Sequence, residues 1–144
     1  MTSIKIKKMT RIESKKVTVN CSQEECFEFL TDMNNYELLL PKKNITDWSS
    51  VEKTSSFKIQ KTYKLVLEHA GDTASSQINI KSGEGSPFKF TLDINLADGA
   101  TTEAQLICDA DINPFLKMMV QKPLNNLFDY MADRIAVVKG GGEA

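Results

Sequence analysis

His69 and Tyr63 are the side chains in this sequence whose types and spacing best suit proton transfer. The run YKLVLEHA alternates apolar and polar residues, which predicts a strand with Tyr63, Leu67 and His69 on one face. A histidine titrates near neutral pH, so with Tyr63 it could bind a polar head group or transfer a proton to an enolisable substrate. We favour the other interpretation, a rim histidine in contact with solvent beside Gly71, because the sequence identifies no partner carboxylate.

The remaining reactive residues point to structure rather than catalysis. Asp109 and Asp111 share a strand face, and paired carboxylates can do acid–base chemistry, but that face lies opposite Leu106 and Cys108 and should be wet. Cys108 has no base or positive neighbour in the sequence, which favours an inert core thiol. We therefore assign no catalytic residue.

An odd, low cysteine count indicates reduced thiols, although a Cys21–Cys26 disulfide remains an alternative. One histidine and the lack of a CxxC pair argue against zinc, and Gly83-x-Gly85 is followed by no helix that could bind a phosphate. We therefore expect neither a metal site nor a cofactor.

Length and composition predict one globular domain. The chain has 144 residues, of which 41% are hydrophobic and 26% charged, with a net charge of −1. No apolar run has the length of a signal peptide or a membrane span, so we expect a cytoplasmic protein without stable membrane insertion. Residues 1–16 are rich in lysine. This basic arm could bind nucleic acid or a membrane surface, but we favour a lysine-protected sheet edge and expect no nucleic-acid partner.

The elements follow from periodicity and capping signals. Residues 12–20 alternate as a strand, and Ser22 with Glu25 forms a capping box for a helix, followed by a second short helical turn at YELLL. Residues 45–112 contain six short alternating runs separated by turn signals such as Asp98-Gly99, which predicts an antiparallel sheet.

A long helix is predicted over residues 113–138, starting at Asn113-Pro114. Pro123 should bend or break this helix, either to follow the curvature of the sheet or to open the mouth of a cavity. The predicted stripe of apolar residues consists of Leu116, Met119, Val120, Leu124, Leu127, Phe128, Met131, Ile135 and Val138.

Two segments resemble the START-like, or SRPBCC, superfamily. These are IESKKVTVNCSQEECFEFLTDMNNYELLLP at the front and LICDADINPFLKMMVQKPLNNLFDYMADRI at the back, and the resemblance covers roughly residues 9–138. It implies an α+β helix-grip fold: a curved seven-stranded antiparallel sheet wrapped around the long C-terminal helix, with two short helices after the first strand. We expect a single domain over residues 1–138 and a flexible tail over residues 139–144.

The resemblance also implies a cavity for a hydrophobic or amphipathic small molecule between sheet and helix. We expect a non-catalytic carrier or binding protein; a polyketide cyclase or aromatase and a co-chaperone-like interaction module with a filled core are the alternatives. We do not expect an oxygenase subunit, because the sequence offers neither the metal ligands nor the additional domain that those members of the superfamily carry. A homodimer is possible. The expected lining consists of Trp48, Tyr63, Leu67, His69, Phe90, Leu92, Leu106, Met119 and Met131.

Overall fold

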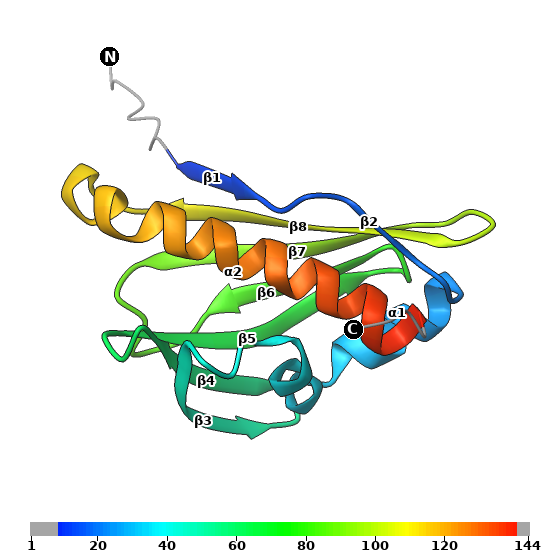
Figure 1. Ribbon diagram of the computed structural model, residues 1–144, viewed down its shortest axis with the longest axis horizontal. Coiled ribbons are helices and arrows are strands. Elements are labelled where there is room, and N and C mark those ends of the chain that lie inside the picture. Colours follow the sequence, from blue (N-terminus) through cyan, green and yellow to red (C-terminus); the bar gives the residue numbers. More distant parts are fainter. Residues whose placement is uncertain (1–8, 141–144) are drawn as a thin grey trace, which may run out of the picture.

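A computed structural model describes residues 9–140 and shows an α+β fold. The chain forms strands, two short helices, a run of strands and one long helix, in the predicted order (Figure 1). The elements are β1 (Thr10–Glu13), β2 (Val17–Val19), α1 (Gln23–Thr31), the 3₁₀ helix η1 (Met33–Leu39), β3 (Ile45–Val51), β4 (Thr54–Ile59), β5 (Tyr63–Thr73), β6 (Gln77–Ser82), β7 (Lys89–Ala97), β8 (Thr102–Asp111) and α2 (Pro114–Gly140).

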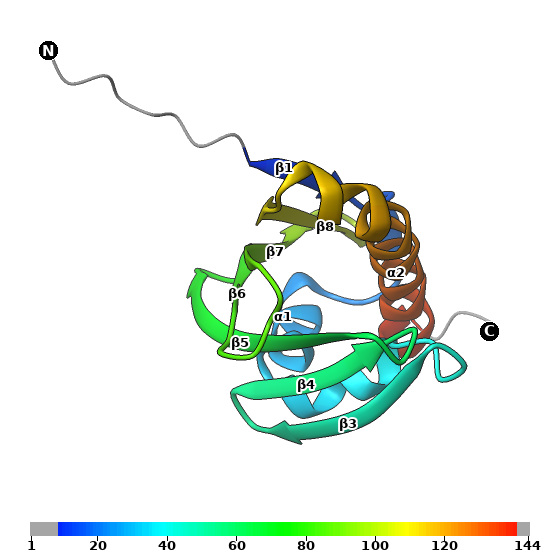
Figure 2. The same cartoon turned by 90° about the vertical axis from the view of Figure 1, so that its left-hand side faces the viewer.

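The strands form one antiparallel sheet that curves around the helices. Its order is β1-β8-β7-β6-β5-β4-β3, and β2 also pairs with β8. Figure 2 shows the sheet bending from β8 round to β3, with α1 inside the curve and α2 closing the open side. The apolar faces of the strands meet the helices in this space, which therefore holds the hydrophobic core.

The first strand differs from the prediction because it is broken at Ser14. Both halves, β1 and β2, pair with β8, so the sheet has eight strands but seven positions across it. The Ser14 amide donates to the Leu106 carbonyl at 2.9 Å, and the Ser14 hydroxyl accepts from the Leu106 amide at 2.9 Å. The side chain thus replaces a backbone carbonyl in the ladder, which satisfies buried polar groups at the break.

The first short helix starts at the predicted capping box, whereas the second starts at Met33, ahead of the turn predicted at YELLL, and both cover one end of the curve. The Ser22 hydroxyl accepts from the Glu25 amide at 3.1 Å, which confirms the capping box at the start of α1. The Asp32 carboxylate caps η1 by accepting from the Asn34 amide at 3.0 Å. The fully buried Tyr36 of η1 contributes to the core at this end.

Helix α2 is continuous through Pro123. The Asn113 side chain caps it by accepting from the Leu116 amide at 2.8 Å, as predicted. Pro123 has no amide hydrogen for the Met119 carbonyl, yet the helix does not break there, and it runs two residues beyond the predicted end, to Gly140. The expected tail is therefore shorter, and residues 141–144 lie outside the described chain, as do residues 1–8 of the basic arm.

One face of α2 packs on the sheet, and it excludes Met119. The prediction that Met119 belongs to the buried stripe is wrong: its side chain is 50% exposed. At about 100° per residue, Met119 falls close to Phe115 and Met118, on the side opposite the buried face. The residues of α2 that are buried are Val120, Leu124, Leu127, Phe128, Met131, Ala132 and Ile135. Within residues 9–140, no helix is long and apolar enough to cross a membrane.

Candidate functional site

A small apolar chamber lies between the concave face of the sheet and the middle of α2. Its volume is about 10 Å³, which is close to the space that a single water molecule needs. The protein's own side chains therefore fill most of the region where the sequence predicted a ligand cavity. The chamber is lined by Phe57, Leu65, Leu67, Phe88, Phe90, Leu92, Cys108, Leu124, Leu127, Phe128 and Met131.

Alternation along the strands and helical spacing on α2 direct these side chains into the chamber. On β7, Phe90 and Leu92 point inward, and Phe88 just before the strand packs against Phe90 with ring centroids 5.7 Å apart. On α2, Leu124 and Phe128 lie one helical turn apart and face the same strands. The lining is consequently continuous across both layers.

A larger pocket, which we call the outer pocket, lies beside Pro123 on α2. It has a volume of about 210 Å³ and mixes apolar with polar groups. The Gln60 amide donates to the Asn44 carbonyl at 3.0 Å, so the β4–β5 turn is tied to the loop before β3 where they form its wall. The outer pocket is lined by Pro41, Asn44, Ile45, Ile59, Gln60, Pro123, Asn126, Leu127 and Tyr130.

Leu127 borders both spaces. It lines the chamber on one side and the outer pocket on the other, and it is itself buried. The Leu127 side chain is thus a shared wall: a change in its rotamer would alter the separation between an apolar interior and a partly polar opening.

Four of the residues predicted to bind a ligand lie together in the chamber lining: Leu67, Phe90, Leu92 and Met131. Trp48 does not line the chamber, but its ring stacks on Phe57, which does, with ring centroids 6.1 Å apart and planes at 20°. Leu106 is fully buried on β8 outside the chamber lining.

Tyr63 and His69 do not converge. Tyr63 begins β5, and His69 lies six residues further along the same strand, or about 20 Å at the usual rise per residue. Neither lines the chamber or the outer pocket. The two side chains share a strand but are too far apart to contact the same small molecule.

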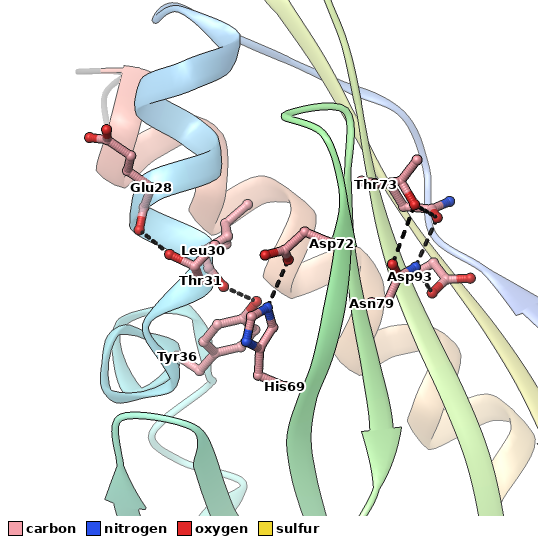
Figure 3. Close-up of polar contacts among 10 residues, drawn as sticks. Glu28, Leu30, Thr31, Tyr36, His69, Asp72, Thr73, Asn79 and Asp93 are labelled. Carbon is pink, nitrogen blue, oxygen red and sulfur yellow. Dashed lines mark hydrogen bonds and ion pairs between the residues drawn. The ribbon is translucent and has the colours of Figure 1, made fainter.

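His69 has a carboxylate partner that the sequence did not reveal. Its Nε2 lies 2.7 Å from Oδ1 of Asp72 (Figure 3). Residues three apart on a regular strand point to opposite faces, but the register shifts between His69 and Gly71, and this bulge returns Asp72 to the face of His69.

The His69–Asp72 pair lies beside Tyr36 rather than in the chamber (Figure 3). The Tyr36 hydroxyl donates to the Leu30 carbonyl at 2.8 Å, and burial raises the pKa of this phenol far above its usual value. Tyr36 is consequently a neutral, hydrogen-bonded part of the core, and the pair belongs to the contact between β5 and the short helices.

Ser55 is a polar group without a partner next to the chamber. Its hydroxyl is fully buried and has no hydrogen bond among the described residues. It lies on the inner face of β4, two residues before Phe57 and paired across the sheet with Leu67, both of which line the chamber. A buried hydroxyl without a partner costs free energy, so this position would favour an incoming polar atom.

Acid–base and metal chemistry have little support at the chamber. Cys108 is its one titratable lining residue, and burial raises the pKa of the thiol to about 12, which keeps it protonated and unreactive. Within residues 9–140, no cluster of histidine, cysteine, aspartate or glutamate side chains could hold a metal ion.

The predicted site omitted several chamber residues whose signals were present in the sequence. Leu65 and Phe88 share strand faces with predicted residues, and Leu124, Leu127 and Phe128 belong to the predicted helix stripe. No sequence pattern could identify Leu127 as a shared wall, because the outer pocket depends on loops that are distant along the chain.

Comparison with known proteins supports the fold but gives no direct functional assignment. No protein-family model matches the sequence, and no curated protein matches it. Solved structures do match over nearly the whole chain. A START superfamily protein from Mycobacterium smegmatis is 15% identical, with a TM-score of 0.62, and the match covers 87% of this chain and 96% of that one.

Two further matches come from proteins with different roles. The Aha1 dimer from Colwellia psychrerythraea is 12% identical, with a TM-score of 0.67 and coverage of 94% of this chain and 100% of that one. A point mutant of norcoclaurine synthase from Thalictrum flavum, in complex with a transition-state analogue, is 11% identical, with a TM-score of 0.69 and coverage of 90% and 93%. These likenesses confirm the fold that the front and back segments predicted, and at such identities they show the fold alone.

Proposed function

Because the chain has the START-like helix-grip fold, we propose that it binds a hydrophobic or amphipathic small molecule between the sheet and α2. The observation that carries this proposal is the position of Leu127, which separates an apolar chamber from an outer pocket. An apolar group would enter from the outer pocket and occupy the chamber when Leu127 changes its rotamer.

The size of the two spaces sets a requirement for binding. The outer pocket, at about 210 Å³, is smaller than the roughly 300–1,000 Å³ typical of sites for drug-sized ligands. A ligand must therefore displace side chains of the α2 lining, where Met131 is unbranched and flexible and Leu127 separates the two spaces. Burial of apolar ligand surface, at roughly 25 cal/mol per Å², would supply the favourable free energy.

Polar groups that could orient such a ligand lie both in the outer pocket and beside the chamber. Asn44, Gln60 and Asn126 line the outer pocket, where they could contact a polar head group. Ser55 offers its unpaired hydroxyl beside the chamber. We propose binding or carriage rather than catalysis, because the chamber lining provides no acid or base apart from the protonated Cys108 thiol.

The test is native mass spectrometry of the freshly purified protein, followed by solvent extraction and titration with the amphipathic fluorophore 1-anilinonaphthalene-8-sulfonate. We expect a bound mass or saturable binding of one probe per chain. Asn126→Trp should fill the outer pocket and weaken binding, whereas Gln121→Trp, at an exposed α2 position outside the pocket, should not. Absence of binding by the wild-type protein, or equal effects of the two variants, would contradict the proposal.

A protein-interaction module is the second candidate function. The observation in its favour is the chamber volume of about 10 Å³, which indicates a largely filled core. This alternative predicts a clean mass in the native spectrum, no saturable probe binding, and no change in probe signal for Asn126→Trp. The same two measurements therefore decide between the candidates.

A further inference from the structure

Large apolar side chains protrude from the first turns of α2. Phe115 is 75% exposed, Met118 is 85% exposed and Met119 is 50% exposed. Their spacing places them on one side of the helix, opposite the face that packs on the sheet. Met9, which precedes β1, is also exposed, and the pairing of Thr10 with Ala110 places it near the end of β8 that leads into α2. We call Phe115, Met118 and Met119 the α2 apolar patch.

Basic side chains surround this end of the molecule. Lys122 lies on the same side of α2 as the patch, whereas Lys117 is in the same turns on the half-buried side. Lys89 begins β7 opposite Asp111, just before α2. Lys61 and Lys64 stand at the β4–β5 turn, which faces the viewer together with the start of α2 in Figure 2. Glu84 and Asp111 are acidic residues at this end, and Glu68 lies against Gly83 of the β6–β7 loop. Asp47 and Asp109 also lie here, but each is paired with a basic side chain, Lys58 at 3.4 Å and Arg11 at 2.8 Å.

The opposite end of the molecule is acidic. It carries the exposed Glu24, Glu25 and Glu28 of α1, and Asp98 and Glu103 at the β7–β8 turn. Basic residues are also present here, among them Lys139 beside Phe29 of α1, but the acidic residues outnumber them at this end. The apolar patch lies at the end where cations predominate.

From this combination we propose that the α2 end docks reversibly on an anionic lipid bilayer. Phe115, Met118 and Met119 would enter the interface between head groups and acyl chains, as the apolar face of an interfacial helix does. The surrounding lysines would meet the anionic head groups, each contributing by charge attraction close to the surface. The docking is peripheral and does not depend on the proposed ligand site.

A second copy of the chain fits the patch less well. A two-fold dimer would place the patch against itself, so the lysines of one copy would face those of the other and repel them. Three side chains also provide much less contact than the roughly 1,200–2,000 Å² buried in a stable protein interface. Charge complementarity therefore favours a partner surface that is negatively charged and into which apolar side chains can insert, as an anionic bilayer allows.

The experiment is co-sedimentation of the full chain with phosphatidylcholine vesicles, with and without phosphatidylglycerol. We expect the wild-type protein to bind the anionic vesicles, with an affinity that falls as salt is added. The triple variant Phe115→Ser, Met118→Ser, Met119→Ser should lose at least about tenfold in affinity, since three large apolar groups no longer enter the interface. The double variant Lys89→Gln, Lys122→Gln should lose affinity for anionic vesicles by about fivefold per lysine.

A matched control uses exposed apolar residues outside the patch. Leu38→Ser with Val51→Ser changes comparable side chains on η1 and β3 and should leave vesicle binding unchanged. Urea unfolding of each variant verifies that it is folded. Failure of the wild-type protein to bind anionic vesicles, equal losses in patch and control variants, or concentration-dependent dimerisation that the patch variant abolishes would each overturn the proposal. Probe binding by the patch variant should persist, which separates this result from failure of the ligand site.

Discussion

The shared wall at Leu127 predicts an unusual response to Leu127→Ala. Truncation removes about three methylene equivalents from a buried side chain, which costs about 2.4 kcal/mol in lost transfer free energy. A closed cavity would add about 24 cal/mol per Å³. Because Leu127 also borders the outer pocket, solvent can reach the space it vacates, so we expect the cavity contribution to be small.

Leu124→Ala is the matched control. Leu124 lies about one turn earlier on α2, is also buried, and lines the chamber but not the outer pocket. The same truncation should therefore leave a closed cavity and cost nearer 5 kcal/mol, at the upper end of measured leucine-to-alanine effects of about 2–5 kcal/mol. The difference between the variants measures the cavity contribution.

Urea unfolding with and without 1-anilinonaphthalene-8-sulfonate provides the assay. We expect Leu127→Ala to bind the probe more tightly than the wild-type protein and to regain stability as probe is added, since a ligand that binds the folded state stabilises it. In Leu124→Ala, both the gain in probe affinity and the recovery of stability on adding probe should be smaller than in Leu127→Ala. Equal losses of stability in both variants, together with unchanged probe binding by Leu127→Ala, would refute the idea that Leu127 separates the two spaces.

Three further predictions follow from single contacts. Ser55→Ala should leave the free energy of unfolding unchanged or raise it in urea titrations, because it removes a buried hydroxyl without a partner; a loss above about 1 kcal/mol would mean that the hydroxyl is bonded in solution. Ser22→Ala should cost about 1 kcal/mol through loss of the α1 cap, measured in the same way, and a neutral result would contradict the capping role. The hydrogen bond and charge of Arg11 lower the pKa of Asp109 below its value in the unfolded chain, so the pair should stabilise the fold above about pH 4 and lose this effect as the pH falls through the lowered pKa. The free energy of unfolding of Asp109→Asn should therefore be slightly below that of the wild type at neutral pH and converge with it in acid. The difference should be small because Arg11 is exposed and Asp109 only half-buried. A difference that widens in acid would mean that the fold raises the pKa of Asp109 rather than lowering it.

The fold was predictable because local signals and the global pattern agree. Strict alternation from Phe88 to Leu96 assigned the buried face of β7, and the caps at Ser22 and Asn113 placed the starts of α1 and α2. The break at Ser14 was not predictable, since it depends on a side-chain hydrogen bond to Leu106, far along the sequence. Local periodicity gives no information about such a partner.

The candidate site was less predictable, for two physical reasons. Asp72 reaches His69 only because a bulge changes which face it occupies, and alternation assumes that no such bulge exists. The volume of the chamber depends on how Phe57, Leu127 and Met131 interlock, and packing at this level is a property of shapes rather than of residue classes. The sequence could therefore propose the lining but not its degree of filling.

Pro123 connects the two proposals physically. It borders the outer pocket and leaves the Met119 carbonyl without the usual helical donor, so the helix is locally weaker there. The segment before it, residues 114–122, contributes Val120 as its one fully buried apolar side chain and carries the α2 apolar patch on its other side. This segment is therefore held by fewer buried side chains than the middle of α2, residues 124–135. A surface that binds the patch would act on the helix immediately before the pocket, so docking and ligand entry would involve the same weakly held turns.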